Sequence, residues 1–123
     1  MVEMNAVTLY VQDLDASIAF YSQLLEREVH PIAEGLVVFI QYSESRLILR
    51  SKASVHPYSH GVGGFELMFN AYTNSKVDAI FNKWKTDGVV ICVPPAMTSY
   101  SYAFLALDPD GHRLKVYSRE NTR

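Results

Sequence analysis

The front of the chain alternates apolar and polar side chains and then changes to a helical period. In "MNAVTLYV" the alternation places Val7, Leu9 and Val11 on one face, which predicts a strand with one buried face. Asp13 then precedes "LDASIAFYSQLL", whose apolar positions recur every three or four residues, so a capped amphipathic helix is predicted. A short segment near residues 29–32 and the stretches "LVVFIQY" and "RLILR" follow, separated by Gly35 and the polar turn "SES". The predicted order is strand, helix and three strands.

The same order returns after a polar, breaker-rich linker at 51–63. The stretch "GFELMFNAY" predicts a strand, and Thr73 or Asn74 can cap a helix over "SKVDAIFNKWKTDG" that ends at Gly88. Strands are then predicted in "VVICVPP", "SYAFLALD" and "HRLKVYS". Between the last two, "DPDG" at 108–111 has the residue types of a type I turn, so a hairpin is predicted there.

This repeat has a physical explanation. A four-stranded sheet with one helix leaves its other face bare, and two such units can cover that face between them. We therefore expect an α+β fold in a single domain over residues 1–123, built from paired βαβββ units at about 4–50 and 64–118. The sheet is expected to be cupped and mostly antiparallel, with the helices outside and a cavity on the concave side.

Composition and charge narrow the function classes. The chain has 123 residues and a net charge of −2, which argues against broad electrostatic binding to nucleic acid. No apolar run reaches the ~18 residues of a membrane span, and the start "MVEMNAVTLY" lacks the pattern of a secretory signal. Cys92 is the single cysteine, so no internal disulfide forms and a cytoplasmic location is expected. Within "VVICV" this thiol is expected to be buried and inert.

Two stretches carry a resemblance to a known family. With "VTLYVQDLDASIAFYSQLL" at the front and "FLALDPDGHRLKVYS" at the back, the chain resembles the vicinal oxygen chelate superfamily over about residues 4–118. That superfamily includes glyoxalase I, extradiol dioxygenases, and fosfomycin and bleomycin resistance proteins. The resemblance implies the fold and, by the family's habit, a homodimer. It leaves the chemistry open, because this fold hosts several reactions and some pure binders.

The resemblance also implies where metal-using members would hold a divalent ion. In those members His or Glu side chains from the first and last strands of each unit are the ligands. The corresponding positions here are Ala6, Ile48, Glu66 and Lys115. Glu66 alone can bind a hard cation, and an ammonium group donates hydrogen bonds instead of lone pairs. We therefore expect no metal and no cofactor. An ion pair between Glu66 and Lys115 is expected in their place, the alternative being a solvent-exposed Lys115.

Inward alternation nominates a set of ligand-binding residues. They are Thr8, Tyr10, Arg50, Glu66, Met68, Asn70, Tyr102, Phe104, Lys115 and Tyr117. An aromatic wall with Arg50 and Lys115 suits a planar or anionic small molecule, the alternative being that the aromatics only fill the cup. Trp84 is assigned to the core and His112 to a structural role.

Three functions compete. The first is a metal-free small-molecule-binding protein resembling the bleomycin resistance branch, with its ligand in the concave cavity. The second is a glyoxalase-like lyase or an extradiol-type dioxygenase (an oxidoreductase), using a divalent metal or acid–base chemistry by Glu66 and Lys115. Mutual pairing of these two side chains would stabilise both charges, which weakens the acid–base version. The third is a structural or regulatory subunit with a residual cavity.

Overall fold

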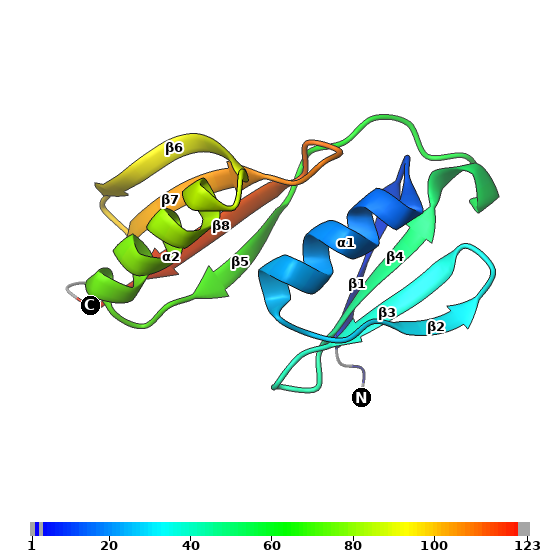
Figure 1. Ribbon diagram of the computed structural model, residues 1–123, viewed down its shortest axis with the longest axis horizontal. Helices are drawn as coiled ribbons and strands as arrows, with labels where there is room; N and C mark the ends of the chain where they lie inside the picture. Colours follow the sequence, from blue (N-terminus) through cyan, green and yellow to red (C-terminus); the bar gives the residue numbers. More distant parts are fainter. Residues whose placement is uncertain (1, 3, 121–123) are drawn as a thin grey trace. The chain divides into compact units, whose positions relative to one another are not determined.

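The chain forms two units with the same order of elements (Figure 1). The computed structural model describes residue 2 and residues 4–120, and it divides into unit 1, up to Gly61, and unit 2, from Val62 onward. Each unit has one strand, one helix and three further strands, which confirms the predicted α+β fold and the predicted repeat. The division falls inside the predicted linker.

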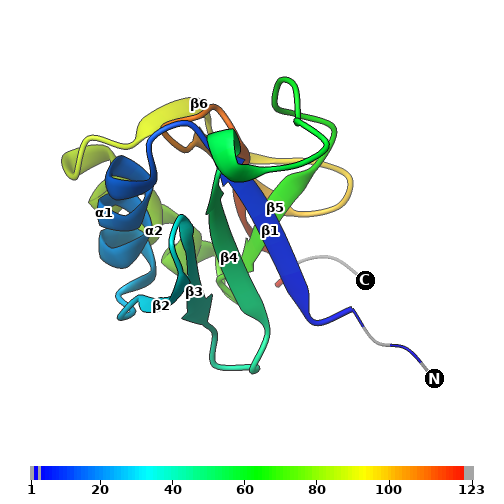
Figure 2. The same ribbon diagram turned by 90° about the vertical axis from the view of Figure 1, so that its right-hand side faces the viewer.

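Unit 1 is a four-stranded sheet with one helix. Its elements are β1 (Ala6–Val11), α1 (Leu14–Leu25), β2 (His30–Ala33), β3 (Leu36–Ile40) and β4 (Arg46–Ser51). The strand order is β1-β4-β3-β2; β1 runs parallel to β4, and the other neighbours are antiparallel (Figure 2). Asp13 caps α1 as predicted, because its Oδ1 accepts a hydrogen bond of 3.0 Å from the backbone N–H of Ala16.

The core of unit 1 lies between α1 and one face of the sheet. Tyr21 of α1 is fully buried, and its ring centroid lies 6.5 Å from that of Phe39 on β3. Leu9 and Val11 point to the same side, as the alternation predicted. The opposite face of this sheet carries the polar residues of β1 and β4.

Unit 2 repeats the arrangement. Its elements are β5 (Glu66–Asn70), α2 (Asn74–Thr86), β6 (Val90–Met97), β7 (Tyr102–Leu107) and β8 (Arg113–Ser118). The strand order is β5-β8-β7-β6, with β5 parallel to β8 and the other neighbours antiparallel. Thr73 is the cap of α2, since its Oγ1 accepts from the N–H of Lys76 at 3.2 Å. Gly88, just beyond the helix, has a φ of 86°, a value that glycine adopts without strain.

Aromatic rings fill the space between α2 and its sheet. The Trp84 ring lies 6.0 Å from Phe69 and 5.4 Å from Phe104, in edge-to-face contacts. Phe81 meets Phe104 at 5.5 Å. Such contacts add to the stabilisation from burial alone. The assignment of Trp84 to the core is therefore confirmed.

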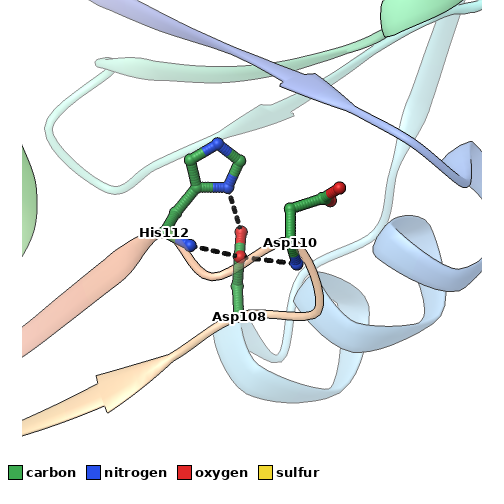
Figure 3. Close-up of polar contacts among 3 residues, drawn as sticks. All are labelled: Asp108, Asp110 and His112. Carbon is green, nitrogen blue, oxygen red and sulfur yellow. Dashed lines mark hydrogen bonds and ion pairs between the residues drawn. The ribbon is translucent and has the colours of Figure 1, made fainter. Parts of the chain in front are cut away.

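The predicted hairpin turn at Asp108–Gly111 is present and held by one carboxylate (Figure 3). Asp108 Oδ1 accepts from the backbone N–H groups of Asp110 and His112, at 2.9 and 2.8 Å. Its Oδ2 lies 2.7 Å from Nδ1 of the buried His112. The predicted structural role of His112 is confirmed.

The expectation for the cysteine needs correction. Cys92 is exposed and not buried, because it lies on β6, which is an edge strand of its sheet. The linker begins with a short 3-10 turn, Lys52–Ser54, and continues without helix as far as β5. None of the described helices is both long and apolar enough to cross a membrane.

Candidate functional site

The face of the unit 2 sheet that does not contact α2 contains a hollow of about 250 Å³. Side chains from all four strands contribute to this face, and β6 and β7 supply its apolar part. The residues lining the hollow are Glu66, Val93, Ala96, Thr98, Ala103, Phe104, Leu105, Arg113 and Lys115. Small-molecule sites are usually lined by apolar side chains together with a few polar or charged groups, and this hollow has both.

The charged groups of this hollow are not paired as predicted. Glu66 Oε2 lies 3.1 Å from Nε of Arg113, so the expected ion pair between Glu66 and Lys115 is wrong. The strand register explains the difference: β5 and β8 place Arg113 directly opposite Glu66, whereas Lys115 lies opposite Met68. Among the described residues, Lys115 has no carboxylate within ion-pair distance. Lys115 is half-buried and lines the hollow, so its ammonium group is available to a ligand there.

The predicted aromatic wall is also wrong in its orientation. Tyr102 donates a hydrogen bond of 2.6 Å from its hydroxyl to Asp78 Oδ1 on α2. Phe104 packs its ring against Phe81 and Trp84 of the same helix. Both side chains thus lie on the helix-covered face of β7, and Phe104, although it is among the residues that line the hollow, has its ring on the α2 side. Because Leu105 pairs with Lys115, and Ala103 with Tyr117, the side chains of β7 on the uncovered face are small or aliphatic.

The hydrogen bond between Tyr102 and Asp78 affects ionisation of the phenol. The bond to the carboxylate raises the pKa of Tyr102 above its usual value, and burial and the negative charge of Asp78 raise it further. Tyr102 is therefore a structural link between β7 and α2, and it is not available to a ligand on the other face.

In unit 1 the nominated residues share a face, as predicted. Thr8 pairs with Ile48, and Tyr10 pairs with Arg50, on the side of the sheet opposite the buried Leu9 and Leu49. Arg50 is already engaged, since its Nη2 donates a hydrogen bond of 3.1 Å to the carbonyl oxygen of Ser54. Its role includes fixing the 3-10 turn that follows β4.

The uncovered face of the unit 2 sheet also carries two further predicted residues and several residues that the sequence analysis missed. Met68 and Asn70 are exposed and alternate with the half-buried Leu67 and Phe69 along β5, so they lie on the face that carries Glu66. The missed Arg113 lies two residues before Lys115 on the same strand, and alternation alone was enough to find it. The β6 residues lining the hollow had no such signal, because the register shifts between Ile91 and Ala96.

The family's metal positions do not fit a divalent ion. The side chains of Ala6 and Ile48 have no atom that could bind a metal ion. The ammonium group of Lys115 donates hydrogen bonds and has no lone pair for a metal, and Glu66 is paired with Arg113. A separate group, Asp108, Asp110 and His112, brings its ligand atoms within 4.8 Å of one another. Both oxygens of Asp108 are already used by N–H groups of the hairpin and by His112 Nδ1 (Figure 3). This group stabilises a turn.

Comparison with known proteins agrees with the fold described above. Protein ATC0852 from Agrobacterium tumefaciens, solved in solution, is 34% identical, with a TM-score of 0.87 over 96% of this chain and 98% of that one. A lactoylglutathione lyase from Agrobacterium tumefaciens has the same fold at 23% identity, with a TM-score of 0.77 over 94% and 92% of the two chains.

A curated relative and a family description complete the comparison. The phenazine antibiotic resistance protein EhpR of Enterobacter agglomerans is 24% identical over 115 residues, which are 91% of this chain and 88% of the relative. Residues 3–116 match the family described as the Glyoxalase/Bleomycin resistance protein/Dioxygenase superfamily. The chain therefore belongs to the glyoxalase, bleomycin resistance protein and dioxygenase superfamily.

Proposed function

We propose that the protein binds a planar, anionic small molecule without a metal, and that it does so on the face of the unit 2 sheet that α2 leaves uncovered. The observation that carries this proposal is the hollow of unit 2, in which the ammonium group of Lys115 lies beside apolar side chains and, among the described residues, has no carboxylate partner. A ligand that combines an apolar ring with a carboxylate complements both features.

The relative named for phenazine antibiotic resistance supports the same class of ligand. A phenazine is a planar aromatic ring system, and a carboxylated phenazine adds the anion that Lys115 requires. On the uncovered face of β8, Tyr117 offers a ring for contact with such a ligand, and Met68 on β5 offers a flexible apolar surface.

The enzymatic alternative has less support from the side chains. The named lyase shares the fold at 23% identity, a likeness that carries no chemistry with it. Acid–base catalysis would need a free carboxylate, and one oxygen of Glu66 is held by Arg113. We therefore propose no catalytic residue, no metal and no cofactor. Elemental analysis of protein purified without chelator measures its metal content and so tests the absence of a metal.

A titration with matched ligands and variants tests the proposal. Phenazine-1-carboxylate should bind to the wild-type protein and shift the backbone NMR signals of β5 and β8. Lys115→Met should weaken this binding about tenfold, the equivalent of ~1.4 kcal/mol, and should change the binding of uncharged phenazine little. Lys76→Met, which removes a positive charge from exposed α2 instead, is the control and should leave both affinities unchanged.

Two results would contradict the proposal. One is equal affinity of the Lys115→Met variant and the wild type for the carboxylate. The other is a stoichiometric divalent metal in the purified protein, which would restore the lyase or dioxygenase alternative.

A further inference from the structure

We propose a second ligand site, in unit 1, for a small monocarboxylate with an apolar group. It lies where the chain leaving α1 passes the beginning of the turn between β3 and β4, at one end of the unit (Figure 1). A hollow of about 400 Å³ occurs there, lined by Arg27, Glu28, His30, Ile40, Gln41 and Tyr42. None of these residues lines the hollow of unit 2 on which the proposed function rests, so the two proposals can be tested independently.

Two unsatisfied donors point to a missing acceptor. Arg27 Nη2 and Gln41 Nε2 are both buried, and neither has a hydrogen-bond partner among the described residues. Native proteins rarely leave a buried N–H group unpaired, because its lost hydration is not replaced. Both residues line the same hollow, so a single acceptor group bound there can pair with both.

The orientation of Arg27 suits a carboxylate. Its guanidinium carbon lies 3.5 Å from the ring centroid of Tyr42, so the face of the guanidinium group is covered by an aromatic ring. Guanidinium groups donate in their own plane, and a carboxylate can accept two of these bonds side by side. Gln41 is anchored by its backbone, which donates to the carbonyl oxygen of Ser45 at 2.8 Å. Tyr42 is 93% exposed and can swing aside to admit the ligand.

The remaining side chains narrow the ligand class. Glu28 is exposed at the rim of the hollow, and the described residues contain no ion pair between it and Arg27. Its negative charge opposes a dianion such as phosphate more strongly than a monoanion. Ile40 is 38% exposed at the same place and offers an apolar contact. The class that fits is a monocarboxylate with a small ring or alkyl group.

Benzoate is the probe, and benzamide is its uncharged control. The side-chain NH₂ signals of Gln41 in the ¹⁵N NMR spectrum report on the site directly. We expect benzoate to move them saturably, with a dissociation constant in the millimolar range, and benzamide to leave them in place. The same titration of the Lys115→Met variant should be unchanged, because Lys115 does not line this hollow.

Two variants should change the affinity for benzoate in opposite directions. Arg27→Gln should weaken benzoate binding about tenfold through loss of a charged donor. Glu28→Gln should strengthen it severalfold, because a like charge is removed at constant shape. Unchanged backbone signals of Leu9 and Phe39 would show that the core of each variant is intact. Equal shifts with benzamide, no saturation with benzoate, or equal affinity in the Arg27→Gln variant would each overturn the proposal.

Discussion

Asp108 is expected to be the most sensitive polar position of unit 2. Its carboxylate is fully buried and takes part in three hydrogen bonds inside the β7–β8 hairpin. A hydrogen bond contributes about 1 kcal/mol net, and a buried donor left unpaired costs about 1–3 kcal/mol. Asp108→Ala removes all three bonds and leaves two backbone N–H groups and one imidazole nitrogen without an acceptor. We expect a loss of about 3 kcal/mol in the free energy of unfolding.

The isosteric variant separates the two parts of this network. Asp108→Asn keeps one oxygen for the backbone N–H groups of Asp110 and His112, and it replaces the oxygen facing His112 Nδ1 by an amide nitrogen. Its loss should be about 1 kcal/mol, the value of one bond.

The measurement is urea-induced unfolding, with the midpoint compared at equal m-value. Glu34→Gln, on an exposed residue of the β2–β3 turn, is the control and should change the free energy by less than about 0.5 kcal/mol. A loss below about 1 kcal/mol for Asp108→Ala would refute the reasoning, because it would mean that water satisfies these donors.

Three further predictions concern other parts of the molecule. Trp84→Ala should destabilise the protein by about 3–5 kcal/mol in urea unfolding, because it empties the space between Phe69 and Phe104; a loss under ~2 kcal/mol would contradict this packing. Tyr102→Phe should cost about 1 kcal/mol at neutral pH. Because the pKa of Tyr102 is raised in the folded state, its stabilisation is complete below a pH of about 10 and is lost as the pH rises through the raised pKa. The difference between wild type and variant should therefore shrink in unfolding experiments at alkaline pH, and a constant difference would contradict the assignment. Light scattering should show the homodimer implied by the family's habit, and a monomer at high micromolar concentration would count against it.

The order of elements could be predicted because each helix and strand is marked by residues close together in the sequence. The caps at Asp13 and Thr73, the alternation in β1 and the Asp-Pro-Asp-Gly turn all depend on residues close together in the sequence. The family positions could be carried over for the same reason, since they lie in β1, β4, β5 and β8 at fixed steps from these motifs. Whether the whole chain is one domain, and whether it works in the cytoplasm, stay predictions.

The predictions that were wrong or missing depended on how segments distant in the sequence pack against one another. The apolar run "YAFLAL" of β7 has no polar position to mark its outer face, so the orientation of Tyr102 and Phe104 could not be read from the pattern. The partner of Glu66 depends on the register, because a shift of two residues would bring Lys115 opposite Glu66 in place of Arg113. The hollow beside Arg27 combines residues of two separate segments, 27–30 and 40–42, and no motif marks it.

The pairing of β1 with β4 has a consequence for how unit 1 folds. These strands join Ala6 to Arg46, so about forty residues must be closed into a loop before the first pair of the parallel ladder forms. The β2–β3 hairpin and α1 need only local contacts and can form early. Attachment of β1 is then a late event on the folding route. Leu9→Ala should accordingly accelerate unfolding much more than it slows folding, and stopped-flow measurements of both rates would show it.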